Sequence, residues 1–509
     1  MPDPGRSCPQ MRLFLQHRLF AAVFALAAAL RVLTITGYSP AVWLEDAFDY
    51  VGVAERMQPY PVRPSGYSFL LWLMRPLHSL AAVVTVQHLM GLAMGVMVYA
   101  LVRRRASRLR TGWAVLAAAP VLLDAYQIFF EHTVLSDVLF SFLVITAVTV
   151  VLWRPRISPG HAVSAGLLLA AATLTRSIGL ILLPLLAGHL LINRSGLRIF
   201  ITTVVAAAIP LGGYAAWYGS WHGSPALNAG SGVWLWARTM PFADCAKIKP
   251  PTDEAVLCPT QPVGLRPASP YFIWSDWSPL RKVPGHPVTT NADLFQPKIN
   301  ELAGSLARRA ILSQPLDYLE VVTRDLQRTL NWKRGPNPHS VPIVYNRYAF
   351  PNAEGPLPDG VRIPGGGIQQ DLRAYERGPT ATAFSEPAAE WMRVYQASVF
   401  LPGPFFGLLS VGALLAYAAT CAVRSRRETA KSAAWPLAIG VALVVGPVVV
   451  TAYDSRYWLP AIPLFCLALA ISVGGRTVDD THDSSSAEEP RSFRTAGRPE
   501  GSGQPDHMG

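Results

Sequence analysis

The chain has 509 residues, of which 51% are hydrophobic and 15% charged, and its mean hydropathy is positive at +0.28. This composition excludes an ordinary soluble globular protein and predicts an integral membrane protein. The net charge of +12 does not indicate nucleic acid as a partner, because the arginines gather in short clusters between apolar segments rather than along one polar face.

About ten apolar segments recur along the chain, each a candidate for a helix that crosses a hydrocarbon core of about 30 Å. They lie near residues 19–38, 80–102, 112–129, 134–153, 160–175, 178–193, 199–219, 397–423, 433–452 and 457–474. The first is too long for a signal-peptide core and no small-residue cleavage site follows it, so we expect a retained helix. Arg176 interrupts the stretch 160–193, which forms either two spans or one tilted helix with a re-entrant piece.

Lysine and arginine are concentrated in alternate short loops, as expected of loops that stay on the cytoplasmic side. These clusters lie at residues 6–18, 103–110, 154–156, 194–198 and 424–431. We therefore predict a multi-pass protein of the cell membrane with both termini in the cytoplasm and a large extracytoplasmic loop.

A polar segment rich in proline, glycine, tryptophan and asparagine precedes the last three apolar segments. The sequence predicts an α-helical polytopic membrane protein with about ten transmembrane helices and an extracytoplasmic mixed domain. Its regions are a membrane module at 1–219 with a first extracytoplasmic loop at 39–79, the mixed domain at 220–395, C-terminal transmembrane helices at 396–475, and a disordered cytoplasmic tail at 476–509.

Within the polar segment, residues 294–332 predict two helices separated at Ser313-Gln314-Pro315, where Ser313 suits a cap and Pro315 a first helical turn. Their mixed apolar and basic faces suit either helices on the bilayer surface or an ordinary pair packed on its own domain. Cys245 and Cys258 share this segment. We expect a disulfide between them if the segment faces an oxidising compartment, with two free thiols as the alternative.

Under this topology, many polar residues at the ends of apolar segments fall on the extracytoplasmic side. They are Asp46, Asp49, Glu131, His132, Asp137, Arg176, Tyr453, Asp454, Arg456 and Tyr457. Acidic groups beside a bilayer rarely persist without a partner or a function, so we expect one site to gather them. Glu131 and His132 are weak candidates for metal ligands, with a solvated loop as the commoner explanation.

Such a set of residues supports transfer of a group from a lipid phosphate. A carboxylate can take the proton of an attacking hydroxyl, and partial desolvation raises its pKa toward that task. The leaving phosphate needs positive charge, which the planar guanidinium of Arg456 or Arg176 supplies. Each of these residues also has a purely structural explanation. Asp46 and Asp137 could cap helices, and Arg456 could anchor a helix end at the headgroups.

Four pieces of sequence resemble GT-C membrane glycosyltransferases that use polyprenyl-phosphate sugars, of the protein-mannosyltransferase and aminoarabinose-transferase type. They are Asp46-Ala47-Phe48-Asp49-Tyr50 with Arg63-Pro64-Ser65-Gly66-Tyr67, then Leu135-Ser136-Asp137-Val138-Leu139-Phe140, then Leu174-Thr175-Arg176, and then Arg456-Tyr457 with Leu459-Pro460, in family order. The resemblance covers about residues 10 to 475. It implies that Asp46 is the catalytic base and Asp137 the second acid. Many relatives carry an acid where this chain has Ala47, and Asp49 either replaces it or is structural.

The resulting hypothesis is an inverting glycosyltransferase that moves a sugar from a polyprenyl-phosphate carrier to an extracytoplasmic glycan, lipid or protein. Arg456, Arg176 and Tyr457 would bind the donor phosphate. No cofactor is certain, and a requirement for a divalent cation stays open. The alternatives are a transporter or flippase of a lipid-linked or small solute and a catalytically inactive scaffold; the absence of an internal sequence repeat disfavours the transporter.

Overall fold

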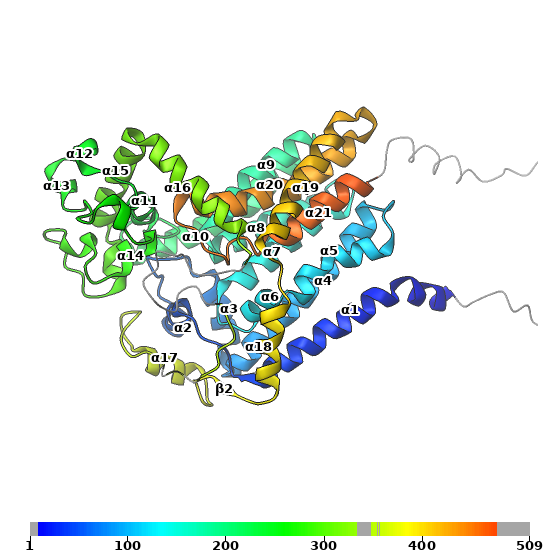
Figure 1. Cartoon of the computed structure of the whole chain (residues 1–509), viewed down its shortest axis with the longest axis horizontal. Helices are drawn as coiled ribbons and strands as arrows, with labels where there is room; N and C mark the ends of the chain where they lie inside the picture. Colours follow the sequence, from blue (N-terminus) through cyan, green and yellow to red (C-terminus); the bar gives the residue numbers. More distant parts are fainter. Residues whose placement is uncertain (1–8, 333–347, 354, 356, 476–509) are drawn as a thin grey trace, which may run out of the picture.

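The computed structural model of the chain describes residues 9–332, 348–353, 355 and 357–475, so the tail expected at 476–509 lies outside the described residues. Most of the described chain is helical. A bundle of long apolar helices forms one part of the molecule, and a group of short helices from the middle of the sequence forms the other (Figure 1).

Six helices in the described part of the chain are long and apolar enough to cross a membrane. They are α1 (Pro9–Gly37), α4 (Leu80–Arg105), α7 (Ser136–Trp153), α10 (Leu197–His222), α19 (Gly403–Ala422) and α20 (Arg427–Val450). The pair α5 (Thr111–Leu123) and α6 (Ala125–Glu131) passes the same test together, with a bend of 50°. The chain is therefore an α-helical multi-pass membrane protein, as the sequence predicts.

Three further apolar segments form shorter helical units. They are α8 (Pro159–Thr175), η2 (Ser177–Ile181) with α9 (Leu182–Ile192), and α21 (Ala461–Gly474). All ten predicted apolar segments are thus helical, although fewer than ten are long enough to span by length. Arg176 has extended backbone, with φ −146° and ψ 128°, and divides the stretch 160–193 into two helical pieces.

The connection between α1 and α4 contains β1 (Tyr38–Ser39), α2 (Glu45–Arg56), α3 (Gly66–Met74) and η1 (Arg75–Leu77). The helix α2 buries an apolar face that includes Phe48 and Val51, and it ends at Met57, whose φ of 50° is left-handed. The strand β1 pairs antiparallel with β2 (Ala383–Phe384), which comes from far along the chain. This first loop is therefore largely helical and is also tied by a strand pair to a distant part of the chain.

Two groups of short elements lie between α10 and α19. The first group is residues 223–332, which we call the polar lobe. It contains α11 (Ser231–Thr239), α12 (Cys245–Ile248), α13 (Thr252–Ala255), η3 (Val263–Leu265), α14 (Ser269–Trp274), η4 (Pro279–Lys282), η5 (Asn291–Phe295), α15 (Pro297–Ser313), α16 (Pro315–Gln327) and η6 (Arg328–Leu330). The second group has α17 (Ile368–Tyr375), which packs on α2, and α18 (Ala388–Ser398), which packs on α1.

A second hydrophobic core includes Trp236, Phe272 and Leu306 of the polar lobe and is joined by Val53 and Tyr60 of the first loop. A disulfide joins Cys245 to Cys258, with the Cα atoms 6.2 Å apart. The helices α15 and α16 meet at Gln314, so the break predicted at Ser313-Gln314-Pro315 and the place of Pro315 in a first helical turn are confirmed. The predicted cap is wrong, because the Ser313 hydroxyl donates to the Arg309 carbonyl inside α15 and Gln314 occupies the N-cap position of α16.

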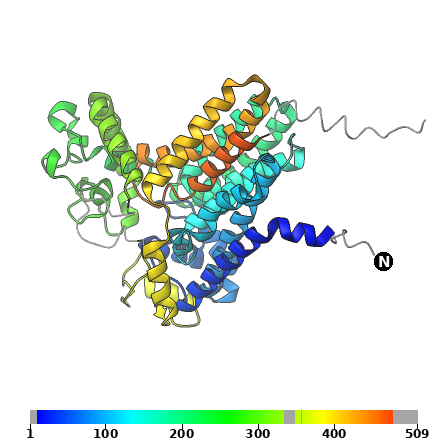
Figure 2. The ribbon, with the colours of Figure 1, turned by 45° about the vertical axis from the view of Figure 1, so that its right-hand side comes forward.

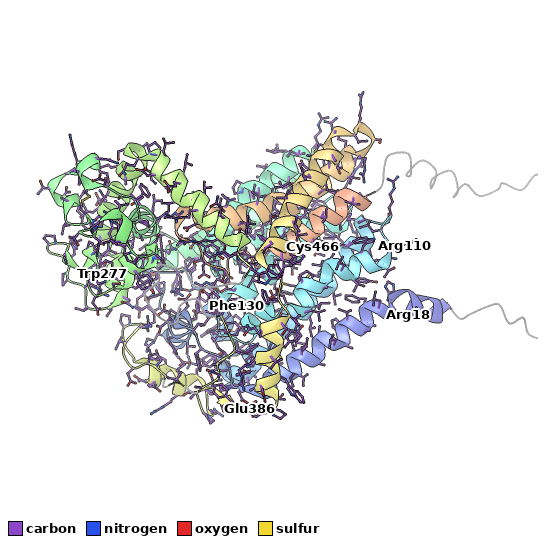
Figure 3. The ribbon with its side chains drawn as sticks, in the orientation of Figure 1. Arg18, Arg110, Phe130, Trp277, Glu386 and Cys466 are labelled. Atoms are coloured by element: carbon purple, nitrogen blue, oxygen red, sulfur yellow. A yellow bond between two sulfur atoms is a disulfide. The ribbon has the colours of Figure 1, made fainter. Side chains whose placement is uncertain are left out.

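The basic clusters and the polar lobe lie far apart. Arg18 and Arg110 lie at one end of the bundle, and Trp277 of the polar lobe lies at the other extreme of the molecule (Figure 3). The beginning of α1 also points away from the polar lobe in the rotated view (Figure 2). The side of the membrane on which each end lies stays a prediction.

Candidate active site

A cavity of about 1500 Å³ lies between the polar lobe and the adjoining parts of the helical bundle. Its walls come from the first loop, the break between α8 and η2, the polar lobe, the segment before α17, and the link between α20 and α21. The charged residues among its lining are Glu45, Asp46, Asp49, Arg63, Arg176, Arg362, Arg393, Asp454 and Arg456. The structure therefore gathers most of the polar residues that the sequence singles out around one space.

Asp46 lies in the first turn of α2 and bonds two arginines from distant parts of the chain. Its Oδ1 is 2.9 Å from Nη1 of Arg63, and its Oδ2 is 3.1 Å from Nη1 of Arg456. The position before α2 is Leu44, and no side chain caps this helix, so the capping alternative for Asp46 is wrong. Asp46 keeps 26% of its side chain exposed, which leaves it accessible from the cavity.

Asp49 follows on the same face of α2, because residues three apart in a helix are neighbours. Its Oδ2 is 3.2 Å from Nη2 of Arg63, so a single guanidinium joins the two carboxylates. The side chain of Asp49 is only 4% exposed. Asp49 is therefore the enclosed member of the pair and Asp46 the accessible one.

The two acids differ in pKa because their environments differ. Burial acts to raise the pKa of Asp46, but Arg63 and Arg456 oppose burial and hold this pKa well below its usual range. For Asp49 burial prevails over Arg63 and Arg362 and raises the pKa from 3.8 to about 6. Asp46 is therefore ionised across the physiological range, whereas Asp49 gains a proton in mildly acidic conditions.

We expect Asp49→Asn to stabilise the protein at neutral pH and to change its stability little at about pH 4. Because the pKa of Asp49 is raised on folding, the fold loses free energy of unfolding as pH rises from about 4 to about 6, with an upper limit of about 3 kcal/mol. Thermal unfolding of the solubilised protein across this pH range measures the effect. Asp46→Asn is the matched control with the opposite sign, and equal shifts in both variants would contradict this account.

Arg456, in the link between α20 and α21, is surrounded by three carboxylates. Besides Asp46, its Nε lies 3.2 Å from Asp454, and its Nη1 lies 3.9 Å from Asp137. The Tyr348 hydroxyl donates to Asp454 over 2.7 Å and so fixes that carboxylate. Arg456 is therefore held at the cavity wall by acids on several sides.

Asp137 connects Arg456 to Arg176. It forms an ion pair with Arg176 and is 5% exposed, while its neighbour Ser136 lines the cavity. The helix α7 has Leu135 at its N-cap and no side-chain cap, so the capping alternative for Asp137 is also wrong. Asp137 is thus placed to position two cations.

Tyr457 lies beside both of these arginines. Its ring centroid is 5.3 Å from the guanidinium carbon of Arg176 and 5.5 Å from that of Arg456. Cations near an aromatic ring are attracted to its electron-rich face. The predicted phosphate-binding residues Arg176, Arg456 and Tyr457 are therefore adjacent, and all three line the cavity.

Glu131 and His132 belong to a different cluster inside the bundle. Glu131 is fully buried, and its Oε2 lies 2.9 Å from Nε of Arg31 on α1. His88 of α4 joins the two residues, with Nδ1 2.9 Å from Glu131 and Nε2 3.1 Å from His132. The prediction that one site gathers every polar residue is wrong for this pair, because the Glu131 side chain is bonded to α1 and α4 and His132 is bonded to His88 inside the bundle.

This inner cluster holds the first loop instead of lining the cavity. The His132 ring nitrogen Nε2 bonds the Tyr38 carbonyl, and the His132 carbonyl accepts from the amide of Val42, four residues before Asp46. Among the residues that the structure describes, no group of three or more His, Cys, Asp or Glu is arranged to hold a metal ion. The geometry thus gives no support to Glu131 and His132 as metal ligands.

The sequence alone gives no role to four residues of the site. Arg63 is visible only as part of a motif, and Asp454 only as a polar residue near a span end. Tyr348 and Arg362 gave no signal, because they come from an irregular segment and reach the site only through tertiary folding. The pair formed by Arg362 and Glu45 closes the cluster on the side of Asp49.

Fold and site together define a multi-pass membrane protein with a cavity in which acids and arginines alternate. No family model matches the chain, and no curated protein matches it in sequence. Among solved structures it is similar to the oligosaccharyltransferase AglB from Archaeoglobus fulgidus in complex with an inhibitory peptide and a dolichol-phosphate, with 12% identity and a TM-score of 0.38 over 94% of this chain and 52% of that chain. The chain thus spans about half the length of AglB.

It is also similar to ArnT from Cupriavidus metallidurans bound to undecaprenyl phosphate, with 13% identity and a TM-score of 0.33 over 90% of this chain and 78% of that chain. The AglB structure holds a dolichol-phosphate and the ArnT structure an undecaprenyl phosphate.

Proposed function

We propose that this protein is an inverting membrane glycosyltransferase that moves a sugar from a polyprenyl-phosphate carrier to an acceptor on the extracytoplasmic side. The observation that carries the proposal is an ionised, accessible carboxylate, Asp46, bonded to an arginine that lines the same cavity as a second arginine. A base and a phosphate-binding cation are the two groups that this reaction requires.

In the proposed reaction, Asp46 takes the proton of the acceptor hydroxyl while the hydroxyl oxygen attacks the anomeric carbon of the sugar. The bond between that carbon and the phosphate oxygen breaks, and the phosphate leaves with the electron pair. Attack on the face opposite the leaving group inverts the anomeric configuration. The leaving phosphate needs no proton, because Arg456 and Arg176 stabilise its charge.

Donor binding and base activation are coupled in this arrangement, because Arg456 serves both. Its Nη1 bonds Asp46 over 3.1 Å. A donor phosphate that binds Arg456 competes with this bond and weakens the effect that holds the pKa of Asp46 low. Asp46 thereby becomes a stronger base when the donor is in place.

The acceptor would enter from the side of the polar lobe. Trp234 and Trp274 line this part of the cavity, with ring centroids 5.9 Å apart, and both are partly buried. Tryptophan rings offer flat apolar surfaces with a polar edge, which suits the faces of a sugar. A glycan acceptor therefore fits this wall.

We expect Trp274→Ala to raise the KM for a glycan acceptor about tenfold, which corresponds to about 1.4 kcal/mol, with a smaller effect on the KM for the donor. The control is Trp277→Ala, because Trp277 is 40% exposed and packs edge-on against Phe272 outside the cavity lining. Steady-state kinetics with each substrate varied in turn gives both constants. Equal effects of the two variants would contradict an acceptor role for Trp274.

The test of the proposal is a transfer assay with purified protein, radiolabelled polyprenyl-phosphate arabinofuranose, mannose and aminosugar donors, and cell-envelope acceptors. Wild type is compared with Asp46→Asn, with and without a chelator that reports any cation requirement. Transfer by wild type and its loss in the variant are expected. Wild-type transfer by folded Asp46→Asn would overturn the role of Asp46, and cysteine labelling that places residue 46 in the cytoplasm would overturn the topology.

A further inference from the structure

The polar lobe exposes a row of leucines where α15 meets α16. Leu312, Leu316 and Leu319 are 81%, 77% and 55% exposed. Their spacing of four and three residues places them along one side of the helical pair, although the break at Gln314 separates Leu312 from α16. Large exposed apolar side chains in a contiguous row mark an interaction surface.

The helix α16 has three distinct sides. Val321 and Val322 face the protein and are buried, while Glu320 and Arg324 are exposed on a polar side. The leucine row, defined as Leu312, Leu316 and Leu319, occupies the remaining side. A helix with one apolar side and charged residues beside it is typical of segments that lie in the membrane interface.

The chain that follows α16 connects this region to the surface of a membrane-spanning helix. Leu330 of η6 packs so closely on α19 that a Cβ added at Gly407 would lie 2.6 Å from its Cδ2. Trp332 is 58% exposed, and its ring centroid lies 6.0 Å from that of Phe405. Phe405 is itself 51% exposed, so exposed apolar side chains continue from the polar lobe onto α19.

The exposed surface of α19 must face lipid, because α19 is one of the spans and its outward side chains are apolar. Leu408, Val411 and Leu415 are 69%, 53% and 66% exposed. On a membrane-spanning helix, outward apolar side chains of this kind contact the acyl chains of the lipid. Exposed apolar residues of the polar lobe and of the lipid-facing span thus meet at Trp332 and Phe405.

The position of α16 along the axis of the bundle is fixed by two hydrogen bonds to the ends of spans, one from α16 itself and one from the residue just after η6. The Tyr318 hydroxyl donates to the carbonyl of Val449, next to the last residue of α20. The amide of Gly403, the first residue of α19, donates to the Asn331 carbonyl just after η6. The helix α16 crosses the direction of the bundle helices in both views (Figures 1 and 2). It therefore lies at the level where the spans leave the hydrocarbon.

We infer that α16 is an interfacial helix whose leucine row contacts the acyl chains of the bilayer leaflet at this end of the bundle. The occupant is lipid rather than another protein, because the helix that carries the row is bonded to the end of α20 and leads through η6 to the lipid-facing surface of α19. This contact fixes the polar lobe against the bilayer beside the cavity. The inference stands on the fold and does not depend on the proposed reaction.

Spin-label accessibility tests the inference in the full-length protein in phosphatidylcholine nanodiscs. Cys8, Cys421 and Cys466 are replaced by Ala while the Cys245–Cys258 disulfide is kept. Single cysteines are then introduced as Leu316→Cys, Leu408→Cys and Leu265→Cys. The three leucines are 77%, 69% and 78% exposed, so they are matched in exposure and differ in place, with Leu408 on a span and Leu265 in the polar lobe outside the leucine row.

The expected result is that the label at 316 behaves like the label at 408, with high collision rates with oxygen and low rates with a water-soluble nickel chelate. The label at 265 should show the reverse pattern. A label at 316 that matches the one at 265 would mean that the row faces water and would overturn the inference. Protection from both agents would overturn it as well, because it would mean that protein covers the row.

Discussion

Asp46→Asn is expected to reduce sugar transfer by about 10²–10⁴-fold, the range that a positioned general base contributes. Asparagine has nearly the same shape, and its side-chain oxygen can still accept a hydrogen bond from Arg63 or Arg456, but it cannot take the proton of the acceptor hydroxyl. The measurement is kcat with saturating donor and acceptor. Retained binding of the donor would show that the loss lies in the chemical step.

The matched control for this prediction is Asp49→Asn. Asp49 shares Arg63 with Asp46 but is enclosed, so we expect a much smaller loss of transfer. The pH dependence of kcat/KM separates the two acids further. If Asp46 is the base, its low pKa leaves no acidic limb near pH 6, whereas a limb at about pH 6 that disappears in Asp49→Asn would assign the base to Asp49.

Arg456→Gln is expected to lower kcat/KM for the donor by about 10²–10³-fold, the usual cost of removing one charge-stabilising donor in an active site. Glutamine removes the cation that faces the leaving phosphate. It also leaves the carboxylates of Asp46, Asp137 and Asp454 without a shared partner. Arg456→Lys retains the charge but not the planar fork, so its activity should be intermediate.

Because unpairing enclosed charges costs about 3–5 kcal/mol, the fold of Arg456→Gln must be checked by thermal unfolding. The control is Arg309→Gln, which removes an arginine that is 50% exposed and paired with Glu254 in the polar lobe. Direct binding of polyprenyl phosphate without sugar provides the decisive readout. A folded Arg456→Gln protein that binds it as tightly as wild type would exclude Arg456 from the phosphate site.

The largest features of this protein followed from its sequence. Crossing a hydrocarbon layer requires about 20 apolar residues that satisfy their own backbone hydrogen bonds, so each predicted segment had to be helical. The break at Arg176 was visible because a charge within an apolar stretch is costly. Asp46, Arg176 and Arg456 were found for the same reason.

Local details were less predictable, because they depend on where a helix starts. Asp46 and Ser313 both have side chains that favour the N-cap, yet α2 begins at Glu45 and α16 begins after Gln314. A shift of two residues for Asp46 and of one for Ser313 removes the capping geometry. Tertiary packing of the first loop and of the polar lobe decided these boundaries.

The composition of the site was decided by tertiary structure. The bond between Asp46 and Arg456 joins residues 410 positions apart, and Tyr348 reaches Asp454 from an irregular segment. Such long-range contacts leave no periodic pattern in the sequence. The apolar segments are visible in the sequence because each one must be apolar along its own length to cross the bilayer. Tertiary packing also turned Glu131 and His132 into the bundle, because the bend before α6 places them between α1 and α4.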